Sequence, residues 1–267
     1  MAARVLPSLA PARRRMVVGA VVLTLVLVAA LAVTLVVRRE PPVEPVPQAE
    51  AGPVLLVPGY GGSTVALEVL ADGLELAGRD VRIVRASGAA TGDLRERAAE
   101  LGRAVDDALE DSGAPSVDVV GYSAGGVVLR LYVAELGGGS TVRRAVTLAS
   151  PHHGTDLAAL AVSFGAEACP EACRQLAPGS DLLRELNAGD ETPEGPVWVA
   201  LWTEDDETVV PPSSGELSGA LGFAVQGICR GLTVGHADVP RNPAVIAMVE
   251  SVLGTDEPVE PGPEVCP

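Results

Sequence analysis

Short apolar runs alternate with longer amphipathic segments over most of this chain, from about residue 53 to residue 253. The strand-like runs cover 53–59, 81–86, 116–121, 143–150 and 195–203. The segments with helical periodicity cover 63–78, 91–113, 124–136 and 241–253. This alternation predicts an α/β fold in which helices cover both faces of a mainly parallel sheet. Its length of about 200 residues is enough for one domain with a substantial core.

Two parts of this predicted domain, 54–253, carry more specific signals. Asn242 and Pro243 have the residue types of an N-cap and a first turn, so they predict the start of the last helix. Residues 155–194 break the alternation, and we expect helical cap or loop structure there, over one end of the sheet. The segment is equally well explained as a mobile lid and as an ordinary helical insertion.

The first part of the chain has a different character. Met16–Val37 holds twenty-two uncharged, mostly apolar residues after the basic segment 1–15, about the length that crosses a membrane as a helix. The arginines before it favour a cytoplasmic N-terminus and an extracellular domain. We therefore predict a retained transmembrane signal-anchor. Two alternatives stay open, a signal peptide cleaved near Ala30–Ala32 followed by secretion, and a buried core helix.

The segments that flank the domain are rich in proline and acidic residues. Residues 38–53 are predicted to form a semi-extended linker and 254–267 a surface tail. All 35 acidic residues follow Arg39, the chain has no lysine, and the formal net charge is −16. This charge argues against nucleic acid as a partner and is typical of a soluble surface.

Four cysteines follow the apolar segment: Cys169, Cys173, Cys229 and Cys266. In an exported domain an even number of cysteines indicates disulfides, and four cysteines allow three connectivities. We favour Cys169–Cys173 with Cys229–Cys266, because the second pair would fasten the tail. Their irregular spacing, without a neighbouring histidine, argues against a metal site.

Ser123 is the candidate nucleophile of the chain. It lies in Gly121-x-Ser123-x-Gly125, between a strand-like run and a helical segment. Glycines at these two positions allow a strand and a helix to approach closely around a sharp turn that presents the serine hydroxyl. A chance occurrence of the pattern in a chain with 30 glycines is the alternative, and the strand–turn–helix context argues against it.

A serine hydroxyl needs a base, and the chain has three histidines. His236 lies in a loop before the last helix. Where a serine nucleophile occupies a strand–turn–helix motif of this kind, the acid and then the histidine follow the serine in the chain. We therefore predict His236 as the base, and we expect His152 and His153 to shape a loop. The acid is predicted among the carboxylates after the 195–203 strand, with Asp206 favoured and Asp205 as the alternative.

The negative charge that develops on a substrate oxygen also needs donors. The backbone N–H of Ala124, next to Ser123, is one candidate. The second is the N–H of Tyr60, in the glycine-rich loop "VPGYGGS" after the first strand.

Five stretches together resemble the class 2 bacterial lipases of the α/β-hydrolase superfamily: "LLVPGYGGS", "VDVVGYSAGGVVLRLYV", "AVTLASPHHGT", "DETVVPP" and "GHADVPRNPAVI". The resemblance spans roughly residues 54–253 and implies a cofactor-independent serine lipase or carboxylesterase. It implies Ser123, Asp206 and His236 as the triad, with the N–H groups of Tyr60 and Ala124 as the oxyanion hole. Pro58 departs from the family, which often has histidine before the oxyanion glycine.

The function expected from these residues is hydrolysis of lipid esters through an acyl-enzyme on Ser123, by a monomer that needs neither cofactor nor metal. A short-chain esterase, an acyltransferase and a thioesterase use the same triad and remain alternatives. A hydrolase-fold binding module without activity is a further alternative, and the presence of all three triad residues argues against it. The scarcity of aromatic residues predicts a mostly aliphatic acyl pocket.

Overall fold

The computed structural model describes residues 11–37, 43, 45–165 and 167–267 and divides into two units, Met1–Pro42 and Val43–Pro267. The first unit contains helix α1, Pro11–Val37. In these described parts of the chain, no helix has both the length and the apolar character of a membrane span. The transmembrane prediction is therefore not confirmed. The basic segment 1–15 and the linker 38–53 lie partly outside the described residues.

The second unit is built on a six-stranded sheet of order β2-β1-β3-β4-β5-β6, in which every neighbouring pair is parallel. Its strands are β1 (Val54–Val57), β2 (Val81–Ile83), β3 (Val117–Tyr122), β4 (Val142–Leu148), β5 (Val197–Trp202) and β6 (Leu221–Ala224). The parallel sheet confirms the predicted fold class. The edge strand β6 was not predicted, because "LGFA" is short and includes a glycine.

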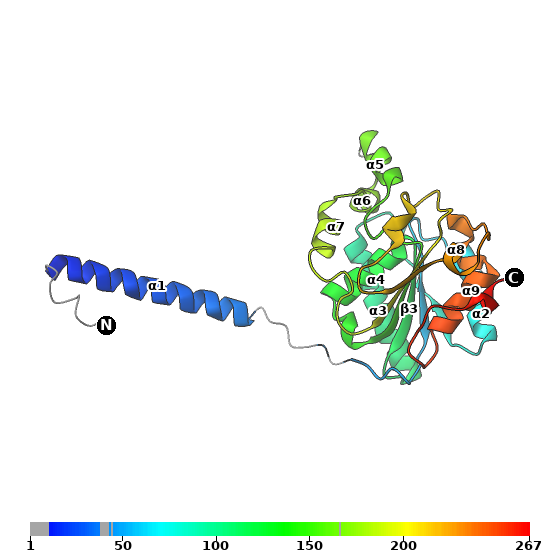
Figure 1. The fold of residues 1–267 in the computed structure, drawn as a ribbon, viewed down its shortest axis with the longest axis horizontal. Coiled ribbons are helices and arrows are strands. Elements are labelled where there is room, and N and C mark those ends of the chain that lie inside the picture. Colours follow the sequence, from blue (N-terminus) through cyan, green and yellow to red (C-terminus); the bar gives the residue numbers. More distant parts are fainter. Residues whose placement is uncertain (1–10, 38–42, 44, 166) are drawn as a thin grey trace. The chain divides into compact units, whose positions relative to one another are not determined.

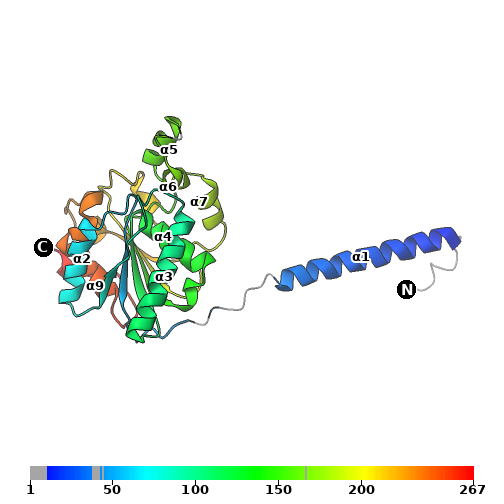
Figure 2. The ribbon, with the colours of Figure 1, turned by 180° about the vertical axis from the view of Figure 1, so that it is seen from behind.

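Helices cover both faces of this sheet (Figures 1 and 2). The α-helices of the unit are α2 (Val65–Leu76), α3 (Leu94–Ser112), α4 (Ala124–Glu135), α5 (Asp156–Ser163), α6 (Glu171–Gln175), α7 (Asp181–Leu186), α8 (Val225–Ile228) and α9 (Pro243–Val252). The 3-10 helices are η3 (Gly138–Ser140), η4 (Pro212–Gly215), η5 (His236–Arg241) and η6 (Pro263–Val265). The predicted cap of α9 is present, since the Asn242 side chain accepts a hydrogen bond from the Ala244 N–H.

The core consists of two layers, one on each side of the sheet. In β3, Val119 belongs to the layer under α3 and α4, whereas Val120 belongs to the layer under α2 and α9. Adjacent residues thus enter opposite layers, as the pleat of a strand requires. Since the sheet is buried on both faces, β1 (VLLV) and β5 (VWVALW) are continuous apolar runs without polar alternation.

The parallel register aligns the carboxyl ends of the central strands. Val57 of β1 pairs with Gly121 of β3, and Leu148 of β4 pairs with Tyr122 of β3 and with Leu201 of β5. The loops that follow these four strands therefore meet at one end of the sheet. That end is where ligands bind in open α/β sheets.

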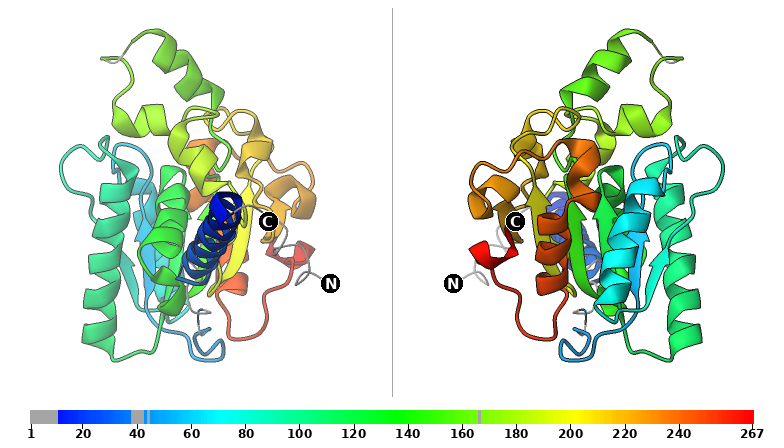
Figure 3. Two further views of the ribbon diagram at one scale, coloured as in Figure 1. Left: turned by 90° about the vertical axis from the view of Figure 1, so that its left-hand side faces the viewer. Right: turned by 90° about the vertical axis from the view of Figure 1, so that its right-hand side faces the viewer.

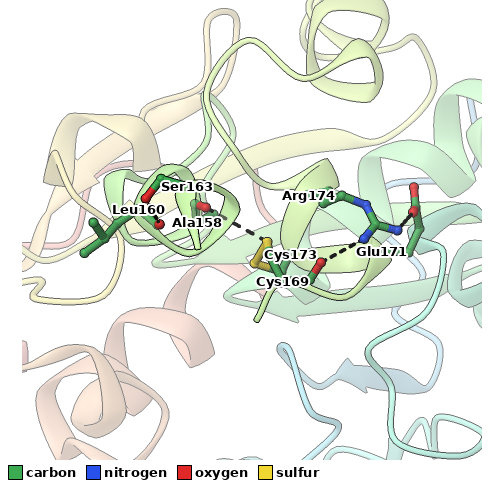
Figure 4. The surroundings of a disulfide bond; sticks show 7 residues. All are labelled: Ala158, Leu160, Ser163, Cys169, Glu171, Cys173 and Arg174. Atoms are coloured by element: carbon green, nitrogen blue, oxygen red, sulfur yellow. Dashed lines mark hydrogen bonds and ion pairs between the residues drawn. A yellow bond between two sulfur atoms is a disulfide. The ribbon is translucent and has the colours of Figure 1, made fainter. Parts of the chain in front are cut away.

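Residues 155–194 contain α5, α6 and α7, and the two views of Figure 3 show α5 extending beyond one end of the sheet. The disulfide Cys169–Cys173 joins the residues before α6 to the helix itself. The Cys169 sulfur lies 4.0 Å from the Ala158 carbonyl oxygen of α5 (Figure 4). The second disulfide joins Cys229 to Cys266. Both pairings confirm the predicted connectivity.

The opposite end of the sheet holds a buried charge cluster around Asp118, the second residue of β3. The Asp118 carboxylate accepts hydrogen bonds from Arg143 at 2.6 and 2.9 Å and from Arg79 at 2.6 Å. The Arg143 guanidinium also donates to the carbonyl oxygens of Gln48, Leu253 and Gly254. The first and last parts of this unit are thus fastened to one cluster.

Candidate active site

Ser123 occupies a strained turn between β3 and α4, with φ 53° and ψ −127°. A residue with a side chain seldom adopts a positive φ, and such strain is concentrated at functional sites. The turn is possible only because residues 121 and 125 have no side chain. A Cβ on Gly121 would lie 2.5 Å from the Gly125 oxygen, and a Cβ on Gly125 would lie 2.3 Å from the Val57 oxygen. Glycine at both positions is therefore a steric requirement, as the sequence predicted.

The hydroxyl of Ser123 is joined to His236 and Asp206 by a continuous chain of hydrogen bonds. His236 Nε2 lies 3.0 Å from Ser123 Oγ, and His236 Nδ1 lies 2.8 Å from Asp206 Oδ2. Both His236 and Asp206 are buried. The other oxygen of Asp206 accepts the N–H groups of Thr208 at 2.9 Å and Val209 at 2.7 Å. These bonds fix the carboxylate in the orientation that holds the imidazole toward the serine.

The two carboxylates beside Asp206 have other partners. Asp205 Oδ2 accepts the N–H of Val234 at 3.0 Å and the side-chain amide of Gln226 at 2.8 Å. Glu207 Oε2 accepts the backbone N–H of His236 at 3.1 Å. The structure thus brings Asp206 to the imidazole, whereas Asp205 and Glu207 hold the backbone of the loop that carries it.

Tyr122, which precedes the serine, supports the same loop from the side of the strand. Its hydroxyl donates to the His236 carbonyl oxygen at 3.0 Å, and the two rings lie 5.2 Å apart between centroids. Burial raises the pKa of Tyr122 well above its ordinary value, with the Asp206 carboxylate as a further cause. The phenol therefore stays protonated and remains a donor at neutral pH. The sequence indicated no role for Tyr122, and it placed Glu207 only among the carboxylates that follow the 195–203 strand.

The two predicted oxyanion donors belong to the residue after Ser123 and to the loop after β1. Ala124 is the first residue of α4, so its N–H is one of the helix N-terminal donors that have no partner within the helix. Tyr60 follows Gly59, where an added Cβ would lie 3.0 Å from the Ser123 Cβ. Among the described residues, neither the Tyr60 N–H nor the Ala124 N–H is bonded to an acceptor. Both donors thus remain available to a ligand at the serine.

A cavity of about 260 Å³ opens beside Ser123. It lies between the loop that carries Tyr60 (the oxyanion loop, 58–63), residues 151–176 and the loop after Asp206. Its lining is mostly apolar: Tyr60, Pro151, Thr155, Leu157, Ala158, Ala161, Ala168, Cys173, Leu176, Thr208 and Val209. Aliphatic side chains outnumber aromatic ones in this lining, in agreement with the expected aliphatic pocket. Larger surface hollows elsewhere, such as the one beside Cys229 and Cys266, do not include the triad.

The other two histidines lie apart from the hydrogen-bonded chain. His152 is fully buried, and its Nε2 lies 3.0 Å from Thr147 Oγ1. Burial lowers the pKa of His152 well below its ordinary value, with the neighbouring Arg130 as a further cause, so the ring is neutral at pH 7. His153 pairs with Glu191 at 3.0 Å near the surface. Within the described part of the chain, no group of three or more potential ligands is arranged to hold a metal ion.

Comparisons with known proteins agree with this architecture. Residues 52–167 match the family model of the alpha/beta hydrolase fold. No curated protein sequence matches the chain significantly.

Several solved structures resemble this chain. Lipase B of Aspergillus fumigatus has a TM-score of 0.67 and 22% identity, over 79% of this chain and 54% of the fungal one. The mature form of Bacillus licheniformis lipase BlEst2 has a TM-score of 0.63 and 19% identity, over 80% of this chain and 96% of that one. A Listeria innocua protein has a TM-score of 0.56 and 18% identity, over 79% and 98% of the two chains. This chain thus spans about half the length of the fungal lipase.

Together, the sheet topology, the family match and these structures define an α/β-hydrolase fold. At this level of identity the structural likeness establishes the fold alone. The particular reaction has to be argued from the residues of the site.

Proposed function

We propose that this protein is a serine hydrolase of carboxylic esters that acts through an acyl-enzyme on Ser123. One observation carries the proposal: an unbroken chain of hydrogen bonds from Ser123 Oγ to His236 and from His236 to Asp206, with distances of 3.0 and 2.8 Å. These distances are within the range required for proton transfer and for orientation of the imidazole.

In the proposed reaction Ser123 Oγ attacks the ester carbonyl carbon while His236 Nε2 takes the hydroxyl proton. The carbonyl oxygen becomes an oxyanion, which the N–H groups of Tyr60 and Ala124 stabilise. Collapse of this intermediate expels the alcohol, which receives the proton from His236. A water molecule then attacks the acyl-enzyme with His236 again as base, and the carboxylic acid leaves. Asp206 keeps its charge throughout and stabilises the imidazolium.

The cavity supports an apolar acyl group as the part of the substrate that lies beside Ser123. Its wall is formed largely by alanine and leucine side chains of α5 and of the residues that flank α6, Ala168 and Leu176, and by Val209. Leu157 of this lining, Leu160 on the same helix and Phe164 at its C-terminal end expose 53%, 56% and 75% of their surface. An apolar acyl pocket beside exposed apolar side chains favours a lipid ester, so we propose lipase activity, with short-chain esterase activity as the alternative.

The test is hydrolysis of p-nitrophenyl esters of short and long acyl chains by the full chain and by Ser123→Ala. We expect hydrolysis by the parent and a loss of about 10⁶-fold in kcat in the variant, since a serine triad without its nucleophile loses about this much. Equal hydrolysis by both proteins would refute the assignment of Ser123. Activity confined to short chains would replace lipase by esterase.

The cellular location is also a proposal, and it rests mainly on sequence. We propose an extracellular hydrolase domain anchored through residues 16–37. The uncharged segment supports it, as do two disulfides of the kind that persist in oxidising compartments. Fractionation of cells expressing the full chain, with protease added outside intact cells, is expected to place the protein in the membrane fraction and to digest the domain. A protein protected in intact cells, or found only in the culture medium, would contradict it.

A further inference from the structure

Arg97 is a buried arginine beside the oxyanion loop. It lies in α3 and exposes only 6% of its surface. Its guanidinium donates to the carbonyl oxygens of Pro58 at 2.5 Å and of Gly59 at 3.2 Å. Among the described residues no carboxylate forms an ion pair with it within 4.0 Å, and burial lowers its pKa. A buried charge whose partners are only carbonyl oxygens is costly to fold, which suggests a role beyond packing.

The peptide group between Gly59 and Tyr60 connects this arginine to the catalytic donor. A trans peptide is planar, so its C=O and N–H point in opposite directions. The only cis peptide among the described residues is Val210–Pro211. The Gly59 carbonyl that Arg97 holds and the Tyr60 N–H that would face the substrate therefore belong to one rigid unit. Fixing the carbonyl fixes the direction of the N–H.

We propose that Arg97 is a positioning residue that aims and polarises the Tyr60 N–H of the oxyanion hole. A charged donor on the carbonyl draws electron density through the amide, which makes the N–H on its far side a stronger donor. The second bond, to Pro58, prevents the preceding peptide from rotating. The inference rests on the proposed ester hydrolysis, because it concerns an oxyanion formed at Ser123.

The helical pattern of α3 marks the position of Arg97 as buried. The buried positions of α3 are Leu94, Arg97, Ala98, Leu101, Val105 and Ala108. Arg97 thus takes a place on the apolar stripe, where an amphipathic helix normally has an aliphatic residue. The helical pattern alone identifies this position as part of the core, and only the structure reveals the partners of Arg97.

The experiment measures kcat and KM of the full chain, Arg97→Met and Arg97→Lys on one p-nitrophenyl ester. Loss of a single oxyanion donor lowers kcat by about 10²–10³-fold. A donor that is present but wrongly oriented should lower kcat by a smaller factor. We expect kcat of Arg97→Met to fall by about 10–100-fold with KM little changed. Arg97→Lys should recover part of the loss, because an ammonium group can still hold one carbonyl.

A second measurement separates positioning from a merely structural role. A boronic acid that forms a tetrahedral adduct with Ser123 should lose affinity for Arg97→Met by about the factor lost in kcat, since both report the oxyanion hole. Arg144→Met is the matched control, a buried arginine bound to the Asp256 carbonyl oxygen at the other end of the sheet. It should lose stability and keep kcat. All assays are run well below each variant's unfolding midpoint.

Three outcomes would overturn the inference: a kcat of Arg97→Met within twofold of the parent, a loss confined to KM, and boronic acid affinity unchanged while kcat falls. Failure of the proposed function would look different. If the proposed function is wrong, Ser123→Ala retains the hydrolysis. If only the inference about Arg97 is wrong, Ser123→Ala is inactive and the Arg97 variants give one of the three outcomes above.

Discussion

Asp205 and Asp206 are adjacent in the chain but have different partners. Asp206 is buried and bonded to His236 Nδ1, whereas Asp205 is exposed and bonded to Gln226 and to the backbone of Val234. One carboxylate therefore orients the imidazole, and the other holds the loop on which the imidazole is mounted. This difference makes the two residues a matched pair for mutation.

Asp206→Asn is expected to lower kcat by about 10³–10⁴-fold, because an amide at this position no longer favours the imidazole tautomer that accepts the serine proton. Asp205→Asn removes a charge of the same size one residue away and should change kcat by less than about tenfold. Steady-state kinetics on one ester, with circular dichroism to verify folding, measures both. Equal losses in the two variants would contradict the assignment of Asp206 as the acid.

At the scale of elements, the site depends on how closely α4 approaches β1 and β3. Gly125 of α4 faces the backbone oxygen of Val57, and Gly121 of β3 faces the backbone of Gly125. Any side chain at these positions meets main-chain atoms, which cannot rotate away as the end of a side chain can. The contact therefore fixes both the turn at Ser123 and the distance between the nucleophile and the oxyanion loop.

Gly125→Ala is expected to destabilise the domain by more than about 3 kcal/mol, since overlap with main-chain atoms forces a backbone shift. Gly227→Ala is the matched control, because a Cβ at this helical glycine meets nothing within 4 Å. It should leave the free energy of unfolding nearly unchanged. Urea denaturation of both variants measures the difference, and similar midpoints would show that α4 can move away from β1.

The elements that the sequence predicted are those with a strong local signal. The five predicted strands and the helices α2, α3, α4 and α9 have apolar patterns long enough to identify, and Gly121 and Gly125 mark the turn at Ser123. Edge strand β6 lacked such a pattern. Contacts of Arg97, Tyr122 and Glu207 join residues that are far apart in the sequence. These contacts depend on the fold, and no local sequence pattern predicts which residue is the partner.

At the scale of the whole unit Val43–Pro267, the cluster around Asp118 stabilises the end of the sheet away from Ser123. Asp118 and Arg143 are fully buried, and Arg79 completes the group. Asp118 is the second residue of β3, and Ser123 follows the last residue of the same strand. The length of β3 separates the charge cluster from the proposed catalytic residues, so the free energy of unfolding and kcat should respond separately to mutation.

Asp118→Asn leaves two arginines without their buried counter-charge and should lower the free energy of unfolding by about 3–5 kcal/mol. Asp181→Asn is the control, because its pair with Arg184 is mostly exposed and contributes little. Urea denaturation measures both. In the folded variant kcat should equal that of the parent. A large loss of kcat in folded Asp118→Asn would show that the two ends of β3 are coupled.

The same cluster determines where a mechanical load enters the domain. One guanidinium, that of Arg143, holds the carbonyl oxygens of Gln48 near the start of the unit and Gly254 near its end. Tension applied through the segment before residue 48 therefore reaches the amino ends of β3 and β4 first. The turn at Ser123 lies at the other end of those strands and is outside the direct path of the force. If residues 16–37 anchor the chain as proposed, tension on this anchor would leave the turn at Ser123 in place.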